Sequence, residues 1–138
     1  MKLVVDASVA IKWAVDEDQH ALARALMNHD ELVAPDFAMF EVANILWKKV
    51  KLGEIGQEQA SAALPGVRRV FARFVPASTL VDRALSLAIE LKHPVYDCLY
   101  PATAEAEAAD VVTADKRFVT AVAGTPHAAR LVLLQDAA

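Results

Sequence analysis

The stretch Leu3-Val4-Val5-Asp6, near the start of the sequence, indicates the fold of the chain. Three apolar residues, two of them β-branched, are typical of a short buried strand, and an acid follows where that strand would end. A second stretch of this kind, Val111-Val112-Thr113-Ala114-Asp115, lies near the other end of the chain. Because ligands bind outside the carboxyl ends of the strands in an open parallel sheet, we expect the two acids to share one site.

Strand-like runs alternate with segments of helical periodicity along the chain. Such alternation predicts the α/β class, with a parallel sheet covered by helices. At 138 residues the chain has the size of one ordinary domain, and no Pro/Gly/Ser-rich linker divides it. The expected strands are residues 3–5, 31–34, 74–76, 111–114 and 130–134.

Pro65-Gly66 interrupts a helical stretch in the middle of the chain. We expect the helix of residues 57–64 to end there and a second helix, residues 67–74, to follow it as a helical hairpin. Three arginines would gather on this hairpin, where they suit an anionic partner or simply a solvated surface: Arg68, Arg69 and Arg73.

Two further helices are predicted from residues that suit a helix start. Asp36, after Pro35, fits the N-cap of a helix that ends at Gly53. Thr79 and Asp82 fit a capping box at the start of another helix. Its apolar stripe would consist of Leu80, Ala84, Leu85, Ala88 and Leu91.

Composition excludes several classes of protein. The net charge of −4 has the wrong sign for a protein that wraps nucleic acid with its whole surface. No stretch approaches the ~20 apolar residues of a membrane helix, so we expect no membrane association. The acid at Asp6 is incompatible with a signal peptide, and we expect a cytoplasmic protein. Cys98 is the single cysteine, so neither an internal disulfide nor a zinc site is expected.

Two more acids, Glu41 and Asp97, also lie beside apolar stretches. Each of the four acids, judged alone, is equally well explained as a helix cap or a solvated residue. Together they predict a cluster, because the junctions that carry them gather at one edge of such a fold. Clustered carboxylates repel one another and need a cation. Oxygen ligands of this kind suit Mg²⁺ or Mn²⁺ and therefore phosphoryl chemistry.

Four stretches, taken together, resemble the acidic motifs of PIN-domain proteins, and particularly those of VapC-type toxins. The stretches are Val4-Val5-Asp6-Ala7-Ser8, Phe40-Glu41-Val42-Ala43-Asn44, Tyr96-Asp97-Cys98-Leu99-Tyr100 and Val112-Thr113-Ala114-Asp115-Lys116-Arg117-Phe118. Their order, their spacing and the total length all agree with that family. The resemblance implies a single PIN domain over residues 1–138, built as a three-layer α/β/α sandwich with a central parallel sheet of four to five strands.

The resemblance also implies an activity and its partners. Members of the family are endoribonucleases that depend on Mg²⁺, which Mn²⁺ can replace, and that cleave RNA with a metal-activated water. Each is paired with an antitoxin that blocks the site, and homodimers are common. A cofactor Mg²⁺, an RNA substrate, a cognate antitoxin and a second copy of the chain are therefore the expected ligands and partners.

Carried over to this chain, the motifs imply a role for each acid. Asp6 and Asp97 would hold the metal most directly, while Glu41 and Asp115 would bind it through water or orient the nucleophile. Three polar residues would support these acids, namely Ser8, Thr113 and Asn44. The expected contacts to RNA are Lys12, Lys116 and Arg117.

Pro101 departs from the family pattern, four residues after Asp97. A proline there cannot donate a hydrogen bond to the Asp97 carbonyl, and its ring crowds that group. We therefore expect the helix to begin after Asp97 or to kink. This departure favours an alternative function, a PIN-fold binding or regulatory module whose catalysis is weakened.

Other interpretations fit the residues less well. A phosphoacceptor receiver domain would need a pair of acids after the first strand, where Asp6 stands alone. A flap nuclease would need a longer insertion than the chain contains. Cys98 with His93 suggests a nucleophile, but a cysteine in an apolar segment usually packs in the core. The aromatic residues are expected in the core or in a dimer contact rather than stacked on bases: Trp13, Phe37, Phe40 and Trp47.

Overall fold

The computed structural model describes residues 2–28 and 31–137 and contains a five-stranded sheet. The strands are paired in parallel throughout, in the order β3-β2-β1-β4-β5. This arrangement confirms the predicted α/β class and the central parallel sheet. The strands are β1 (Lys2–Val5), β2 (Glu31–Pro35), β3 (Arg73–Val75), β4 (Asp110–Thr113) and β5 (Leu131–Leu133).

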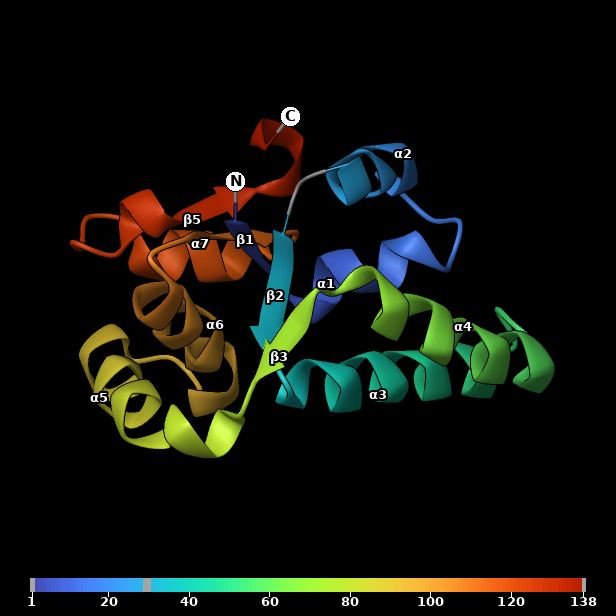
Figure 1. Cartoon of the computed structure of the whole chain (residues 1–138), viewed down its shortest axis with the longest axis horizontal. Helices are drawn as coiled ribbons and strands as arrows, with labels where there is room; N and C mark the ends of the chain where they lie inside the picture. Colours follow the sequence, from blue (N-terminus) through green and yellow to red (C-terminus); the bar gives the residue numbers. More distant parts are fainter. Residues whose placement is uncertain (1, 29–30, 138) are drawn as a thin grey trace.

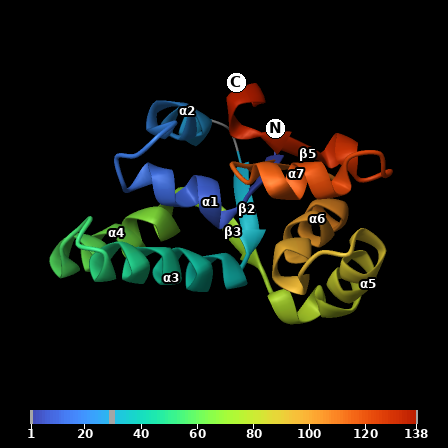
Figure 2. The same cartoon turned by 180° about the vertical axis from the view of Figure 1, so that it is seen from behind.

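Helices cover both faces of the sheet. Helices α1 to α4 lie on one side of it and α5 to α7 on the other, as the two opposite views show (Figures 1 and 2). The three-layer α/β/α sandwich is therefore confirmed. The helices are α1 (Ala7–Ala10), α2 (His20–Ala25), α3 (Phe37–Lys51), α4 (Gln57–Val70), α5 (Val81–Leu91), α6 (Val95–Glu107) and α7 (Lys116–Val122). None of those described is long and apolar enough to cross a membrane.

The hydrophobic core lies on the two faces of the central strands. Val4, Val5 and Val111 are completely buried, as is typical of a strand covered on both faces. Helix α3 buries Ala38 and Val42, four residues apart, which fixes the side of the helix that faces the core. Rigid packing around β1 and β4 therefore sets the positions of the residues that follow these strands.

The helical hairpin predicted from Pro65-Gly66 is wrong. Helix α4 continues through both residues and ends at Val70. Proline removes one hydrogen-bond donor, which would have served the carbonyl of Ser61, and Ser61 is exposed so that water can replace it. Val67, on the next turn, is completely buried. Packing of this turn against the core offsets the local cost of the proline and the glycine.

The predicted group of three arginines is also divided. Arg68 and Arg69 lie in the last turn of α4, whereas Arg73 belongs to β3. The Arg73 guanidinium pairs with Glu31, at 3.2 Å, and with Glu107. Arg73 therefore joins β3 to neighbouring elements and is not part of a basic surface on α4.

The predicted capping residues serve other contacts. Helix α5 begins at Val81, and the Thr79 hydroxyl donates to the Pro76 carbonyl at 2.7 Å, so the capping box is wrong. Asp36 stands at the start of α3, but its carboxylate accepts from the Ala77 backbone N–H at 2.9 Å. Local propensity placed both helices correctly, while tertiary contacts decided which groups the polar side chains bind.

The stripe predicted for α5 is partly wrong. Leu80, Ala84 and Leu91 are buried as expected, but Leu87 is buried in place of Leu85. The Leu85 side chain faces solvent, together with Val81 and Ile89. Helix α5 thus has apolar side chains on its exposed side as well as on the side that contacts the core.

Candidate functional site

The strand order brings Asp6 and Asp115 to one point of the sheet. From β1 the chain builds β2 and β3 on one side, and it later adds β4 and β5 on the other. Such a reversal of strand order opens a crevice at the carboxyl ends of the two middle strands. Asp6 follows β1 directly, and its backbone N–H donates to the Val112 carbonyl of β4 at 3.2 Å. Asp115 follows β4 after one residue, because the strand ends at Thr113 and not at Ala114 as predicted.

Asp6 is the most deeply buried of the four acids, with 7% of its surface exposed. Its Oδ1 accepts from the Ser8 backbone N–H at 2.8 Å and from the Ser8 hydroxyl, and its Oδ2 accepts from the Thr113 hydroxyl at 2.6 Å. Burial raises the pKa of Asp6 to about 6 despite these hydrogen bonds, and the charge of Asp115 adds to the shift. Asp6 is thus both the N-cap of α1 and a carboxylate whose charged form is disfavoured by burial.

Ser8 and Thr113 connect the ends of the two central strands. Ser8 Oγ accepts from the Ala114 backbone N–H at 3.0 Å, and Thr113 Oγ1 accepts from the Asp115 backbone N–H at 3.0 Å. Both hydroxyls also donate to Asp6. Two of the three residues expected to support the acids therefore hold the turns after β1 and β4 together.

Asp115 caps helix α7. Its Oδ1 accepts from the backbone N–H groups of Arg117 and Phe118, at 3.0 and 3.3 Å. The capping role considered for this residue is thus real, and it is Oδ1 that caps the helix. Phe118 is almost completely buried, so the cap also fixes the first turn of α7 against the core.

Glu41 lies in the second turn of α3 and is only partly exposed. Its Oε1 accepts from the hydroxyl of Tyr100 at 2.5 Å. Burial raises the pKa of Glu41 to about 7, the hydrogen bond from Tyr100 opposes the shift, and the charges of Asp6 and Asp97 add to it. The charges of two of the other three acids therefore act on Glu41.

Asp97 lies in the first turn of α6, and a histidine holds its carboxylate. His93 Nε2 is 2.7 Å from Asp97 Oδ2, four residues away. The His93 ring in turn stacks on Phe118, with 4.7 Å between ring centroids. Because the Phe118 ring is buried, the imidazole has a firm support from which to orient Asp97.

Pro101 lies inside α6, and the helix begins at Val95, before Asp97. The expectation of a later helix start is therefore wrong. The proline still leaves the Asp97 carbonyl without its helical donor, at a cost of about 3 kcal/mol in a helix interior. Pro101 is itself buried, and α6 contacts β1, β2 and β4. Packing of the helix against the sheet offsets this cost and keeps Asp97 at the edge of the site.

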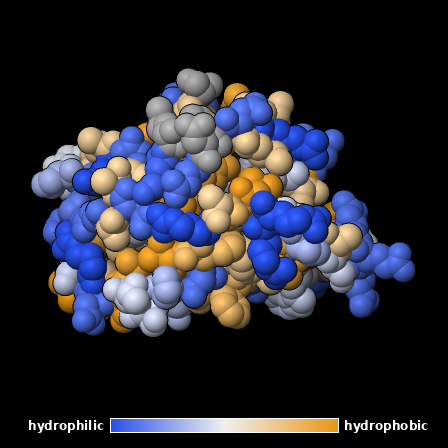
Figure 3. Space-filling view, viewed as in Figure 1, coloured by the Kyte–Doolittle hydropathy of each residue, from blue (hydrophilic) through white to orange (hydrophobic). Residues whose placement is uncertain are grey.

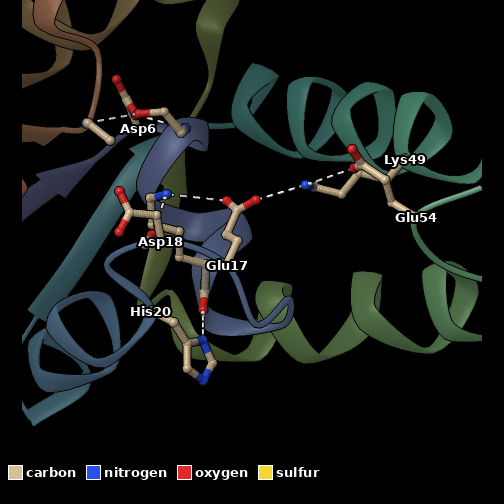
Figure 4. Close-up of polar contacts among 9 residues, drawn as sticks. Asp6, Glu17, Asp18, His20, Lys49 and Glu54 are labelled. Atoms are coloured by element: carbon tan, nitrogen blue, oxygen red, sulfur yellow. Dashed lines mark hydrogen bonds and ion pairs between the residues drawn. The ribbon is translucent and has the colours of Figure 1, made fainter. Parts of the chain in front are cut away.

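The expected basic contacts differ in their surroundings. Lys12 Nζ is 3.3 Å from Glu17 and 2.8 Å from the Asp18 carbonyl, so its charge is already paired. Glu17 also binds Lys49 at 2.7 Å, and Figure 4 shows this ion pair apart from Asp6. Two other basic residues are exposed directly after Asp115, namely Lys116 and Arg117.

A pocket of about 310 Å³ adjoins the acids on the α3 side. Glu41 and Asn44 line it, so Asn44 lies one turn beyond Glu41 on the face expected from the sequence. The remaining lining is aromatic and apolar: Phe37, Phe40, Ile45 and Tyr96. Phe37 stacks on both Phe40 and Tyr96, which links the first turns of α3 and α6.

Sequence reasoning missed the roles of Tyr100 and His93. Tyr100 lies three residues after Asp97 in α6, and His93 lies four residues before Asp97, just ahead of the helix. This short separation was the available signal. The sequence suggested for His93 only a pairing with Cys98 as a nucleophile. Cys98 is buried, and burial raises the pKa of its thiol to about 11, which does not suit a nucleophile.

The donor set fits a hard divalent cation. It consists of carboxylate oxygens, and two of the acids, Asp6 and Glu41, have raised pKa values that a nearby cation would lower. Within residues 2–28 and 31–137, no three acidic, histidine or cysteine side chains lie close enough to ligate one ion together. Mg²⁺ requires fewer, because it keeps several waters and takes one or two protein carboxylates.

Fold and site together define a class: a doubly wound α/β domain with an acidic site at the reversal of strand order. A family model of the PIN domain matches residues 3–123. Ribonuclease VapC3 from Pyrobaculum aerophilum is 35% identical over 120 residues, which cover 85% of this chain and 92% of that protein. Ribonuclease VapC1 from Mycobacterium tuberculosis is 32% identical, with 94% and 96% covered. The chain belongs to the PIN-domain family and, within it, to the VapC-type proteins.

Solved structures share the fold. The crystal structure of PAE2754 from Pyrobaculum aerophilum superposes with a TM-score of 0.72 at 25% identity, over 98% of this chain and 85% of that one. VapBC2 from Rickettsia felis, bound to a DNA fragment from its promoter, superposes with a TM-score of 0.63 at 15% identity, over 96% and 97%. The resemblance inferred from the four motifs is confirmed.

Proposed function

We propose that this protein is a Mg²⁺- or Mn²⁺-dependent endoribonuclease of the VapC toxin type, which hydrolyses RNA phosphodiester bonds. The proposal is supported chiefly by the set of four acids, Asp6, Glu41, Asp97 and Asp115. The pKa values of two of them, Asp6 and Glu41, are raised by burial and by the charges of neighbouring acids. Relatives that are named ribonucleases support the choice of RNA as the substrate. Since cellular RNA is the substrate, we expect the protein to act in the cytoplasm.

Each acid has surroundings that suit a different task. Asp6 and Asp97 would hold the metal most directly, and Asp115 would take part through its uncapped oxygen. A bound divalent cation would polarise the scissile phosphate and make a water more acidic. Glu41, with a pKa near 7, is suited to accept the proton of the attacking water. Attack by water in line with the leaving oxygen would leave a 5′-phosphate and a 3′-hydroxyl.

Contacts to the RNA would come from residues beside the acids. Lys116 and Arg117 are exposed at the start of α7 and suit the phosphates that flank the cleaved bond. Lys12 would have to leave Glu17 before it could bind RNA, so we assign it a smaller part. Asn44, in the pocket next to Glu41, is placed to support that carboxylate or a base edge.

Purified protein is expected to cut a circular single-stranded RNA in Mg²⁺ or Mn²⁺, and EDTA should lower the rate at least about 100-fold, because the acids repel phosphate unless a cation is present. A circular substrate has no ends, so its cleavage distinguishes an endonuclease from an exonuclease. Mapping of the new ends should find a 5′-phosphate, and a circular DNA of the same sequence serves as the control.

Two outcomes would contradict the proposal. Cleavage that persists in EDTA would exclude the metal-dependent mechanism. A protein that binds Mn²⁺ by calorimetry but leaves both circles intact would favour the alternative of a binding or regulatory module, which Pro101 suggested.

We further propose that two copies associate through an apolar surface on α5 and the starts of α3 and α6. Val81, Leu85 and Ile89 recur every fourth residue on the exposed side of α5, and Ile89 is 71% exposed. Figure 3 shows hydrophobic side chains that reach the surface over α5 and α6. Exposed apolar side chains that recur on one side of a helix are typical of an interaction site. A cognate antitoxin is the second proposed partner, on the resemblance to VapC-type toxins.

Ile89→Lys is expected to convert a dimer into a monomer, because a buried lysine on the two-fold surface would lack a partner. Sedimentation equilibrium should give about twice 14.9 kDa for the wild type and 14.9 kDa for the variant. Leu52→Lys is the matched control, since Leu52 is equally exposed but lies at the far end of α3. A wild type that is monomeric at about 100 µM would argue against this surface.

A further inference from the structure

Tyr100 is a buried polar residue to which the proposed chemistry gives no part. Only 2% of its surface is exposed, yet its hydroxyl makes two hydrogen bonds. It donates to Glu41 Oε1 at 2.5 Å and accepts from the Ala7 backbone N–H at 3.3 Å. Three segments that carry acids therefore meet at one oxygen: α3 with Glu41, the turn from Asp6 into α1, and α6 with Asp97.

The two hydrogen bonds use the hydroxyl in a defined way. A phenol has one proton to donate, and it goes to Glu41, while a lone pair receives the N–H of Ala7. Ala7 is the first residue of α1, so its N–H has no acceptor within that helix. Tyr100 thus satisfies a group directly bonded to Asp6 and, with the same atom, fixes the direction of Glu41.

The surroundings keep the hydroxyl protonated. Burial and the charges of Glu41 and Asp6 hold the pKa of the Tyr100 phenol well above its usual range. The donor is consequently present throughout the pH range in which RNA is cleaved. Because the phenol does not exchange its proton, it is suited to orient Glu41 and not to act as an acid or base itself.

We propose that Tyr100 is a positioning residue, whose hydroxyl fixes Glu41 relative to the Asp6 turn so that the acids of three separate elements face one point. This inference rests on the proposed ribonuclease function and names a residue that its four acids need. The ring of Tyr100 packs in the core in either case. The hydroxyl alone carries the proposed role, and Tyr100→Phe removes it while keeping the ring.

Tyr100→Phe is expected to lower kcat for RNA cleavage about 10- to 100-fold, with KM changed less than about 3-fold, because substrate binding does not involve the hydroxyl. The matched control is Thr103→Val. Thr103 is also buried in α6, and its hydroxyl donates to the Leu99 carbonyl, within the same helix and away from the acids. The control should lose thermal stability without a fall in kcat. A Tyr100→Phe variant with wild-type kcat overturns the proposal.

A double-mutant cycle tests whether Tyr100 acts through Glu41. Glu41→Gln alone should be slower than Tyr100→Phe, and the variant with both substitutions should be no slower than Glu41→Gln. Independent, multiplicative losses would overturn the proposal, because they would mean that Tyr100 acts on something other than Glu41.

The same cycle measured on Mn²⁺ affinity by calorimetry separates this inference from the proposed function. Tyr100→Phe should weaken Mn²⁺ binding about 3- to 10-fold in the wild-type background. In the Glu41→Gln background the same substitution should cause no further loss of Mn²⁺ affinity. Coupled Mn²⁺ affinities in a protein that cuts no RNA would retain the positioning role and reject the ribonuclease. If the wild type cleaves RNA but neither kcat nor Mn²⁺ affinity shows coupling between Tyr100 and Glu41, the ribonuclease is retained and the positioning role is rejected. A wild type that neither cuts RNA nor binds Mn²⁺ would reject both.

Discussion

Asp6→Asn is expected to lower the rate of RNA cleavage on the order of 10³-fold, a loss comparable to the removal of a main electrostatic group from an active site. Asp6 is the acid that the fold fixes most firmly, since β1 ends directly before it and Ser8 and Thr113 bind both of its oxygens. The amide keeps the shape of the side chain but removes the negative charge. Single-turnover cleavage of the circular RNA in Mn²⁺ measures the effect.

Stability provides the control on this experiment. Asp6→Asn removes a buried charge, so without metal at pH 8 the variant is expected to unfold at or above the temperature of the wild type. Its loss of activity would then not be due to unfolding. Asp110→Asn is the matched substitution, because Asp110 is exposed at the opposite end of β4 and should leave the rate unchanged. An Asp6→Asn variant that keeps a tenth of the rate would remove Asp6 from the proposed site.

The sequence was sufficient for the layers of the fold because those depend on local patterns. Runs of β-branched residues marked β1 and β4, and the acids at their ends followed from the geometry of any parallel sheet. The same rule could not place Glu41 or Asp97, which stand on helices. They were included because both lie beside apolar stretches, and the family motifs then supported that choice. The charge of Asp97 contributes to the raised pKa of Glu41.

Contacts between elements were beyond sequence reasoning. Tyr100 meets Glu41 across 59 positions of the chain, and no local pattern encodes such a pair. Lys12 appeared free because Glu17, its partner, lies in a loop whose course cannot be read from propensities. Pro65 failed as a helix breaker for a related reason. The buried position of Val67 in the same helix outweighs the local preference of the proline.

The acids also predict how stability depends on pH. The pKa of Asp6 is raised in the folded state to about 6 from 3.8, and that of Glu41 to about 7 from 4.5. For each acid, at pH values between its unfolded and its folded pKa, the folded protein binds more protons than the unfolded chain. The free energy of unfolding therefore falls as the pH rises through this interval. The loss begins near pH 4 and is complete above about pH 8. The pKa values of Glu17 and Glu105 are lowered in the folded state, so these two acids make the free energy of unfolding rise with pH, but only at more acidic pH.

Metal-free wild type is therefore expected to lose about 2–3 kcal/mol of stability between pH 5 and pH 8, because each unit of pKa shift corresponds to about 1.4 kcal/mol. Asp6, whose folded pKa lies about one unit above pH 5, contributes about half of this loss, and Glu41, whose larger shift is discounted because the side chain is partly solvated, contributes the rest. Urea titrations in EDTA measure this slope. Asp6→Asn should flatten it, and Asp110→Asn should not.

Mn²⁺ should reverse the loss, since a cation that binds only the folded protein stabilises it according to its concentration. The rise in melting temperature on adding Mn²⁺ should be larger at pH 8, where the acids are ionised, than at pH 5, where bound protons compete. It should be absent in Asp6→Asn. A wild type whose stability is constant from pH 5 to 8 would show that Asp6 and Glu41 do not have raised pKa values. Equal stabilisation by Mn²⁺ at both pH values would show that the ion binds elsewhere than at these carboxylates. The pH profile thus tests the energetic basis of the site without any measurement of cleavage.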